Sequence, residues 1–189
     1  MKILQFAFAG ALALATFTGG ALAQSGENIL TVQLKDGPVV IELRPDIAPK
    51  HVQQIKELAA AGEYDNVAFH RVNKGFMAQT GDVEFGDMED GFNPDRAGTG
   101  GSKLGDLPAE FSQTPFERGT VGMARSQDPN SANSQFFIMF DEGAFLNGQY
   151  TVVGKVVSGM ENVDKIKRGE GGNGEVSDPD RMVKVTVGK

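Results

Sequence analysis

The chain has 189 residues, of which 40% are hydrophobic and 23% charged, and its formal net charge is −7 at pH 7. This length suits one domain, and the acidic balance argues against nucleic acid as a partner, because binding phosphates requires a basic surface. With no cysteine and only two histidines, the chain lacks the means for disulfides, thiolate metal sites or a cysteine nucleophile. We expect no bound metal and no cofactor.

The first 23 residues have the pattern of a secretory signal peptide. Lys2 provides a positive start, an almost wholly apolar run follows over residues 3–17, and Ala21-Leu22-Ala23 fits a signal-peptidase site. A membrane anchor is the weaker interpretation, because the run falls short of the roughly 20 apolar residues that a spanning helix needs. We therefore expect cleavage after Ala23, export to a bacterial periplasm, and no membrane association afterwards.

The mature chain is expected to begin with a short polar leader, residues 24–28, followed by one domain over residues 29–189. Residues 29–34 and 38–43 are β-type runs joined by an Asp-Gly turn, a combination typical of a β-hairpin. Residues 48–61 have helical spacing of apolar side chains, with glycine after the last position.

Strands dominate the rest of the chain. They are predicted over residues 67–72, 76–80, 120–124, 134–140, 150–157 and 181–187, and a second helix is predicted over residues 159–168. Residues 81–105, rich in Gly, Asp and Asn, are predicted to form a long ordered loop or a mobile flap. About eight strands joined mostly by loops predict a mainly β, largely antiparallel fold, which can close into a barrel filled by side chains.

The most informative residues lie between positions 69 and 79. On paired strands, side-chain alternation would put Arg71 and Gln79 on a common face, with the bulky apolar side chains of Phe76 and Met77 nearby. A single arginine on a strand is usually solvated or salt-bridged. Its combination with Gln79 and the Phe-Met pair raises Arg71 above that interpretation.

Three stretches together resemble the cyclophilin family of peptidyl-prolyl cis-trans isomerases. Residues 69–82, FHRVNKGFMAQTGD, are similar to that family's FHRxxxGFMxQxGD signature. Residues 119–138, GTVGMARSQDPNSANSQFFI, resemble its GxxSMAxxxxxxSQFFI region, and residues 145–156, FLNGQYTVVGKV, its xLDGxxxxFGxV region. The resemblance runs from about residue 29 to residue 187. It implies a closed eight-stranded antiparallel β-barrel capped by two α-helices.

The resemblance also implies roles for individual residues. Arg71 matches the family's catalytic arginine, and Gln79 would hold it in place. The implied substrate-binding residues line an apolar pocket for the proline ring or bind the peptide beside it: His70, Phe76, Met77, Ala124, Arg125, Ser126, Gln135, Phe137, Phe145, Leu146 and Tyr150. By alternation, only one of Phe136 and Phe137 can face this pocket, and the match selects Phe137.

The chain departs from the family pattern at several positions. Phe145 stands where the family often has Trp, and Tyr150 where many members have His. Asn73 and Lys74 replace an apolar-Pro pair, and Thr80 replaces a Gly, which can alter the local backbone. We expect isomerase activity to be retained despite these changes.

Two other patterns favour structural interpretations. The Gly-rich residues 98–101 could suggest phosphate binding, but they lack the Lys-Ser/Thr of a P-loop and no helix signature follows. A loop bordering the groove is the preferred interpretation. The acidic side chains between residues 84 and 90 lack the twelve-residue spacing of a calcium loop, which favours a solvated loop.

The sequence therefore predicts an exported, monomeric isomerase that rotates Xaa-Pro bonds in unfolded or newly exported polypeptides. The alternative is a non-catalytic chaperone or scaffold module that binds proline peptides. Arg71 discriminates between them, because a module that only binds does not need it. A barrel carrying a small apolar ligand is a third possibility, disfavoured by the large side chains expected inside.

Overall fold

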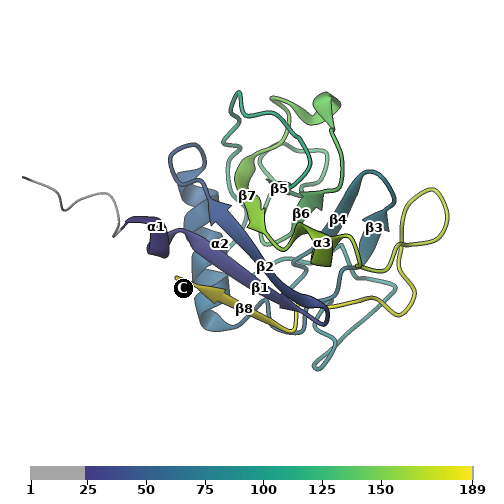
Figure 1. The fold of residues 1–189 in the computed structure, drawn as a ribbon. Coiled ribbons are helices and arrows are strands. Elements are labelled where there is room, and N and C mark those ends of the chain that lie inside the picture. Colours follow the sequence, from purple (N-terminus) through teal and green to yellow (C-terminus); the bar gives the residue numbers. More distant parts are fainter. Residues whose placement is uncertain (1–23, 189) are drawn as a thin grey trace, which may run out of the picture.

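The computed structural model describes residues 24–188, in which eight antiparallel strands form one curled sheet with helices packed against it (Figure 1). The strands are β1 (Ile29–Leu34), β2 (Gly37–Leu43), β3 (Arg71–Asn73), β4 (Met77–Thr80), β5 (Thr120–Met123), β6 (Phe136–Met139), β7 (Val152–Ser158) and β8 (Lys184–Val187). The helices are α1 (Gln24–Glu27), α2 (Pro49–Ala61), the 3-10 turn η1 (Ala144–Leu146) and α3 (Met160–Val163). The predicted signal peptide lies outside the described residues, and α1 occupies most of the predicted leader.

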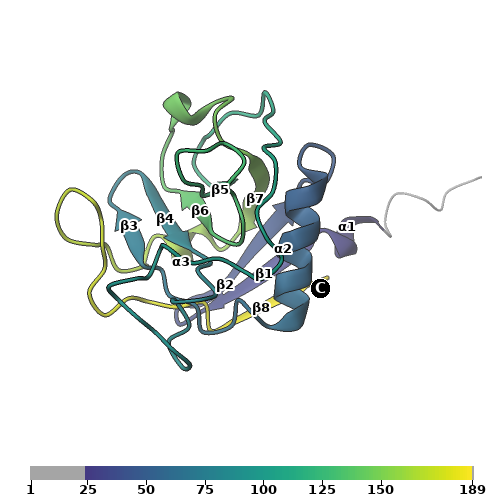
Figure 2. The same cartoon turned by 180° about the vertical axis from the view of Figure 1, so that it is seen from behind.

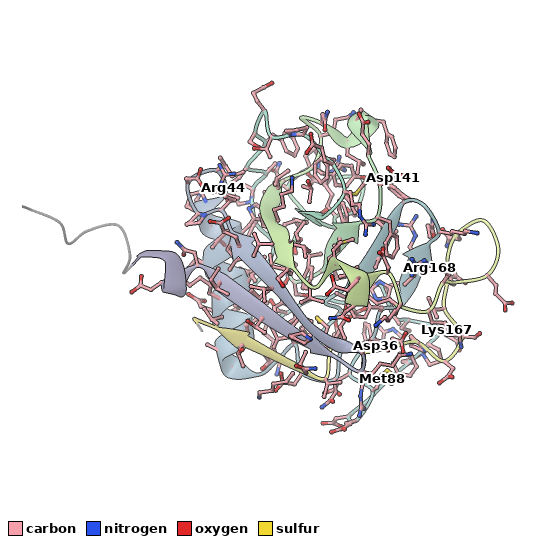
Figure 3. The ribbon with its side chains drawn as sticks, in the orientation of Figure 1. Asp36, Arg44, Met88, Asp141, Lys167 and Arg168 are labelled. Atoms are coloured by element: carbon pink, nitrogen blue, oxygen red, sulfur yellow. The ribbon has the colours of Figure 1, made fainter. Side chains whose placement is uncertain are left out.

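The Asp-Gly turn forms the predicted hairpin. Leu34 pairs with Gly37, so Lys35 and Asp36 alone connect β1 to β2, and Asp36 is labelled at the tip in Figure 3. Gly37 has a φ of 136°, a left-handed conformation that side chains disfavour. Buried and more exposed residues alternate along both strands, so one face of the hairpin belongs to the core.

The sheet is open, so the expected closed barrel is wrong. The strand order is β3-β4-β6-β5-β7-β2-β1-β8, which leaves β3 and β8 as edges of a curled half-barrel. Residues 66–71 and 174–182 meet across this gap only through isolated bridges such as Ala68 with Arg181, and through single backbone hydrogen bonds. The strand predicted over residues 67–72 therefore shrinks to the short β3, and the one predicted over residues 181–187 to β8.

Three residues explain why no continuous ladder crosses the gap. Asn66 and Asp178 have positive φ angles of 62° and 53°, which interrupt an extended backbone. Pro179 has no N–H to donate to a ladder. These breaks leave too few consecutive extended residues for β3 and β8 to pair.

Helix α2 agrees with its predicted range to within one residue and lies across the rear face of the sheet (Figure 2). Pro49 occupies the first turn, where its missing N–H costs nothing, and Gly62 ends the helix in a left-handed conformation. The helix lacks a local side-chain cap; Glu110 instead accepts hydrogen bonds from the backbone N–H groups of Lys50 and His51. Val52, Ile55 and other buried residues face the core.

The second predicted helix, residues 159–168, is mostly absent as a helix. Only α3 is helical, and the chain continues in tighter turns in which the N–H of Lys165 bonds the carbonyl of Asn162 and that of Ile166 bonds Val163. Arg168, labelled in Figure 3, ends this segment with its guanidinium 3.9 Å from the centre of the Phe140 ring. The charged side chains of this segment run from acidic (Glu161, Asp164) to basic (Lys165, Lys167, Arg168), a pattern that favours a helix, but only one helical turn forms.

Two apolar clusters form the core. The larger lies between α2 and the sheet and contains Tyr64 and Phe136, whose rings meet edge to face. The smaller cluster consists of Met77, Phe116, Phe137, Met139, Leu146 and Val152. Strands β5 and β6 are buried along their whole length. Val121 and Met123 of β5 enter the larger cluster, whereas side chains of β6 enter both. Among the described residues, no helix has the length and apolar character that crossing a bilayer requires.

Candidate active site

Strands β3 and β4 bring Arg71 and Gln79 together, as side-chain alternation predicted. The two residues are direct cross-strand partners, and Nη1 of Arg71 donates a hydrogen bond of 3.2 Å to Oε1 of Gln79. The tight turn between the strands includes Gly75, whose φ is 71°, and is closed by a bond from the Phe76 N–H to the Asn73 carbonyl. The turn thus fixes the register that pairs the two polar side chains.

A second contact holds the guanidinium from the other side. Nε of Arg71 donates to the carbonyl oxygen of Asn173 at 2.9 Å, across 102 positions of sequence. Two of the three guanidinium nitrogens are therefore occupied by protein acceptors. No hydrogen bond joins Nη2 to another residue of the described range 24–188. This nitrogen remains able to donate to a bound molecule.

Arg71 and Gln79 form part of the lining of a cavity of about 260 Å³. We call it the proline pocket; its other lining residues are Phe76, Met77, Ala124, Arg125, Phe137, Phe145, Leu146 and Tyr150. They come from β4 and the turn before it, from β6 and η1, and from the segments that follow β5 and η1. Ten of the predicted site residues thus surround one hollow.

The floor of the proline pocket belongs to the smaller core cluster. Phe137 stacks on Phe116 with ring centres 5.7 Å apart, and Tyr150 meets Phe137 edge to face at 6.0 Å. Gly122 makes this stack possible, because a Cβ there would lie 2.5 Å from Phe116 and 2.6 Å from Phe137. Phe136 points the other way, into the larger cluster.

The rim is more exposed. The Phe145 ring lies 5.5 Å from that of Phe76 and is 65% exposed. Arg125 crosses to the opposite segment, with its guanidinium 4.3 Å from the centre of the Tyr150 ring and Nη2 donating to the Gln149 carbonyl at 2.9 Å. The rim residues therefore contact one another above a rigid floor.

A second cavity, of about 480 Å³, adjoins the proline pocket and shares Gln79, Ala124 and Arg125 with it. We call it the polar groove. Two predicted site residues, Ser126 and Gln135, line this groove and not the pocket. Backbone from Gly98 to Ser102 forms its far wall, so the Gly-rich loop does border the groove.

His70 lies in neither lining. Its side chain is 8% exposed, and its two ring nitrogens have no hydrogen-bond partner within the described part of the chain. Burial lowers the pKa of His70, because a charged imidazolium is poorly solvated there. The ring lies against Gly98, so His70 supports the loop that walls the polar groove. Its predicted contact with substrate stays a prediction.

Three of the departures from the family pattern, Asn73, Lys74 and Thr80, lie outside the lining of both cavities, whereas Phe145 and Tyr150 line the proline pocket. Asn73 and Lys74 belong to the β3–β4 turn. Thr80 is fully buried, and its hydroxyl donates to the Ala68 carbonyl at 2.9 Å. This bond ties the end of β4 to the segment that precedes β3.

The sequence did not indicate that the backbone carbonyls of Asn173 and Gly100 hold site residues in place. Gly100 accepts a 2.8 Å hydrogen bond from Nε2 of Gln135, whose Oε1 accepts one of 2.9 Å from Nε2 of Gln79. Both contacts link segments far apart in the sequence, and no local pattern marks them. Within residues 24–188, no group of three or more His, Asp or Glu is arranged to hold a metal ion.

Comparison with known proteins gives a consistent result. The family model described as "Cyclophilin type peptidyl-prolyl cis-trans isomerase/CLD" matches residues 29–187. A protein of Brucella suis biovar 1 named "Probable peptidyl-prolyl cis-trans isomerase" is 63% identical over 191 residues, covering 99% of this chain and 97% of its own. A Brucella abortus protein with the same name is 62% identical over the same length.

Solved structures agree with the fold. A cyclophilin from Hirschia baltica is 27% identical and superposes with a TM-score of 0.71, over 86% of this chain and 74% of its own. A cyclophilin type peptidyl-prolyl cis-trans isomerase of Cryptosporidium parvum, crystallised in the presence of the dipeptide Ala-Pro, is 26% identical with a TM-score of 0.73. That match covers 85% of this chain and 99% of the other.

Proposed function

Because the chain belongs to the family of cyclophilin-type peptidyl-prolyl cis-trans isomerases, we propose that it is an exported member that acts on Xaa-Pro bonds of unfolded or newly exported polypeptides. Unaided prolyl isomerisation takes tens to hundreds of seconds, so it can limit folding. A soluble monomer acting outside the cytoplasm would remove that limit. No cofactor is needed for the reaction.

Prolyl isomerisation can be catalysed by non-covalent binding alone. Rotation about the amide meets a barrier of about 18–20 kcal/mol because it breaks amide resonance, and no bond to the enzyme has to form. A catalyst needs only to bind the twisted amide more tightly than either planar form. As the bond twists, the proline nitrogen becomes pyramidal and regains a lone pair that can accept a hydrogen bond.

Arg71 supplies the donor in this proposal. Its guanidinium lies at the wall of the proline pocket, with Nε bound to Asn173 and Nη1 bound to Gln79. Nη2 would donate to the proline nitrogen of the twisted amide. Because the donor is already held in place, little reorganisation accompanies the reaction, which strengthens the effect of the hydrogen bond on the barrier. This tethered guanidinium beside a hollow lined mostly by aromatic and aliphatic side chains is the observation that carries the proposal.

In this proposal the two cavities bind different parts of the peptide. Phe76, Met77, Phe137 and Leu146 would hold the proline ring, with Phe145 and Tyr150 at the edge of the pocket. Backbone and side chains of Ala124, Arg125, Ser126 and Gln135 would bind the adjoining peptide. The Ala-Pro dipeptide used with the Cryptosporidium parvum protein supports a proline-containing peptide as ligand for this fold.

The catalytic part of the proposal is tested by Arg71→Ala. We expect kcat to fall about 100-fold or more in a protease-coupled assay on a Xaa-Pro peptide, as for loss of a single preorganised donor. Peptide affinity, measured by calorimetry, should change much less. Arg44→Ala is the matched control, because Arg44 pairs with Asp46 on the surface and should not affect turnover. Undiminished turnover in Arg71→Ala would overturn the proposed mechanism.

Export is tested separately. The support is the pattern of residues 1–23, a positive start, an apolar run and Ala-Leu-Ala. Expressed from its own first codon in a bacterium with two membranes, the protein should be recovered from the periplasmic fraction with Gln24 as its first residue. Mass spectrometry of the intact protein measures this. A full-length product in the cytoplasm would contradict export.

A further inference from the structure

Asp82 is a buried carboxylate near the start of the long loop that follows β4. Its side chain is fully buried, yet the described residues place no cation against it. Four backbone N–H groups take that place: Oδ1 accepts from Glu84 at 3.1 Å and Phe85 at 3.0 Å, and Oδ2 from Gly98 at 2.7 Å and Gly100 at 3.0 Å. Hydrogen bonds to an ionised acceptor are the stronger kind, so Asp82 fixes two turns of the long loop at once.

The two glycines allow this close approach. A Cβ on Gly100 would lie 2.5 Å from Oδ1 of Asp82, and one on Gly98 would lie 2.9 Å from the ring of His70. Gly98 also has a φ of 97°, where other residues are strained. The Gly-Thr-Gly run that resembles a phosphate loop is therefore explained by its fit between Asp82 and His70.

The fixed Gly100 anchors a directional chain of hydrogen bonds that ends at Arg71. The Gly100 carbonyl can only accept, so Gln135 must present its Nε2 there and turn its Oε1 toward Gln79. Gln79 must then present its Nε2 to Gln135 and its Oε1 to Arg71, which can only donate. The Gly100 carbonyl at one end and the Arg71 guanidinium at the other thus determine how both glutamine amides are oriented.

We propose that Asp82 is a positioning residue for Arg71, acting through Gly100, Gln135 and Gln79. This inference rests on the proposed catalytic role of Arg71. Asp82 lines neither the proline pocket nor the polar groove, so it does not touch substrate. Its effect on turnover passes through the loop backbone and the two glutamines. If the loop shifts, the Gly100 carbonyl leaves Gln135, both amides can flip, and the guanidinium loses the acceptor that orients Nη1.

The test is a double-mutant cycle between Asp82→Asn and Gln135→Met. The new amide of Asp82→Asn would set an N–H₂ donor against two backbone donors of the loop, while its volume hardly changes. We expect kcat/KM to fall about 10- to 100-fold in the otherwise native chain, as for a misplacement of about 1 Å. Gln135→Met already breaks the chain of hydrogen bonds, so in that background Asp82→Asn should lower kcat/KM by no more than about twofold.

Thermal unfolding separates positioning from structural support. The fall in melting temperature caused by Asp82→Asn should be the same in both backgrounds, because the substitution disrupts the same hydrogen bonds to the loop backbone in each. The control is Asp87→Asn, in the same long loop, whose Oδ1 bonds the N–H groups of Glu89 and Asp90. It has no link to Gly100, and kcat/KM should stay unchanged.

Two results would overturn the inference: a folded Asp82→Asn with native kcat/KM, or an equal fall of kcat/KM with and without Gln135. If Asp82→Asn does not fold, Gly100→Ala replaces it in the cycle, because its Cβ displaces the loop from Asp82 while the carboxylate remains. Native turnover in Arg71→Ala would instead refute the proposed function. The two failures are therefore distinct.

Discussion

The proline pocket and the polar groove adjoin and share a wall, but they are built in different ways. The pocket owes its shape largely to side chains on strands and on η1, with Phe137 and Leu146 part of an apolar cluster. The groove owes its far wall to loop backbone from Gly98 to Ser102, held through a buried carboxylate. The pocket is therefore a part of the core, whereas the groove depends on a few hydrogen bonds.

Because of this difference, substitutions in the two cavities should affect the stability of the protein and its binding of peptide to different extents. Changing a residue of the pocket floor alters the free energy of unfolding as well as binding, because the same atoms fill the core. Changing a residue of the groove alters peptide binding or the orientation of Arg71 with a smaller effect on stability. Three measurements test that separation.

The largest effect is expected at the pocket floor. Phe137→Ala should lower the free energy of unfolding by about 3–5 kcal/mol, because removal of a buried ring stacked on Phe116 leaves a cavity. Phe145→Ala removes the same group from the rim of the same pocket, where the ring is 65% exposed, and should cost no more than about 0.5 kcal/mol. Urea denaturation measures both. Similar costs at the two positions would show that the floor is not part of the core.

A smaller effect is expected where the two cavities meet. Arg125→Ala removes the contact with the Tyr150 ring and the bond to the Gln149 carbonyl. Loss of these contacts frees the wall that the two cavities share, and we expect roughly a fivefold rise in KM, which corresponds to about 1 kcal/mol of binding free energy. Because Arg125 is assigned to binding, kcat should remain near native in the same protease-coupled assay. A loss of kcat as large as that of Arg71→Ala would mean that the wall takes part in the reaction.

The last prediction concerns His70, behind the wall of the groove, where the effect appears only in the pH dependence of stability. Burial lowers its pKa below the ordinary value of 6.5, so in mildly acidic solution the unfolded chain binds a proton that the folded chain does not. Stability should therefore fall as the pH drops below about 6.5, and His70→Gln should reduce that slope by at most about 1.4 kcal/mol per pH unit. Urea denaturation between pH 7 and pH 5 measures it. An unchanged slope in His70→Gln would show that a group other than His70 causes the pH dependence of stability.

The same contrast explains what the sequence could predict. Strands β1, β2 and β4 and helix α2 fall within a residue of their expected ranges, because periodicity and turn residues report local structure. The pairing of Arg71 with Gln79 followed from alternation alone. Assigning the rest of the pocket lining required the family resemblance, since Phe137 and Leu146 are ordinary core residues by pattern.

What could not be predicted depends on contacts between distant segments. The bonds from Arg71 to Asn173 and from Gly98 to Asp82 each involve a loop, and loops have no periodicity to reveal a partner. The open sheet has a similar cause, because the breaks at Asn66 and Asp178 are single-residue conformations within otherwise strand-like surroundings. The second helix is shorter than predicted, because a charge pattern favours a helix without fixing its length, and the chain turns more tightly after Val163.

The described chain begins and ends at one side of the sheet: the Gly188 N–H bonds the Ile29 carbonyl, and β1 and β8 lie at the opposite end of the strand order from β3 and β4 (Figure 1). An affinity handle or a fused partner joined near residue 24 or residue 188 would therefore extend away from both cavities. Attachment to a solid support through either terminus should leave the entrance open to a passing polypeptide.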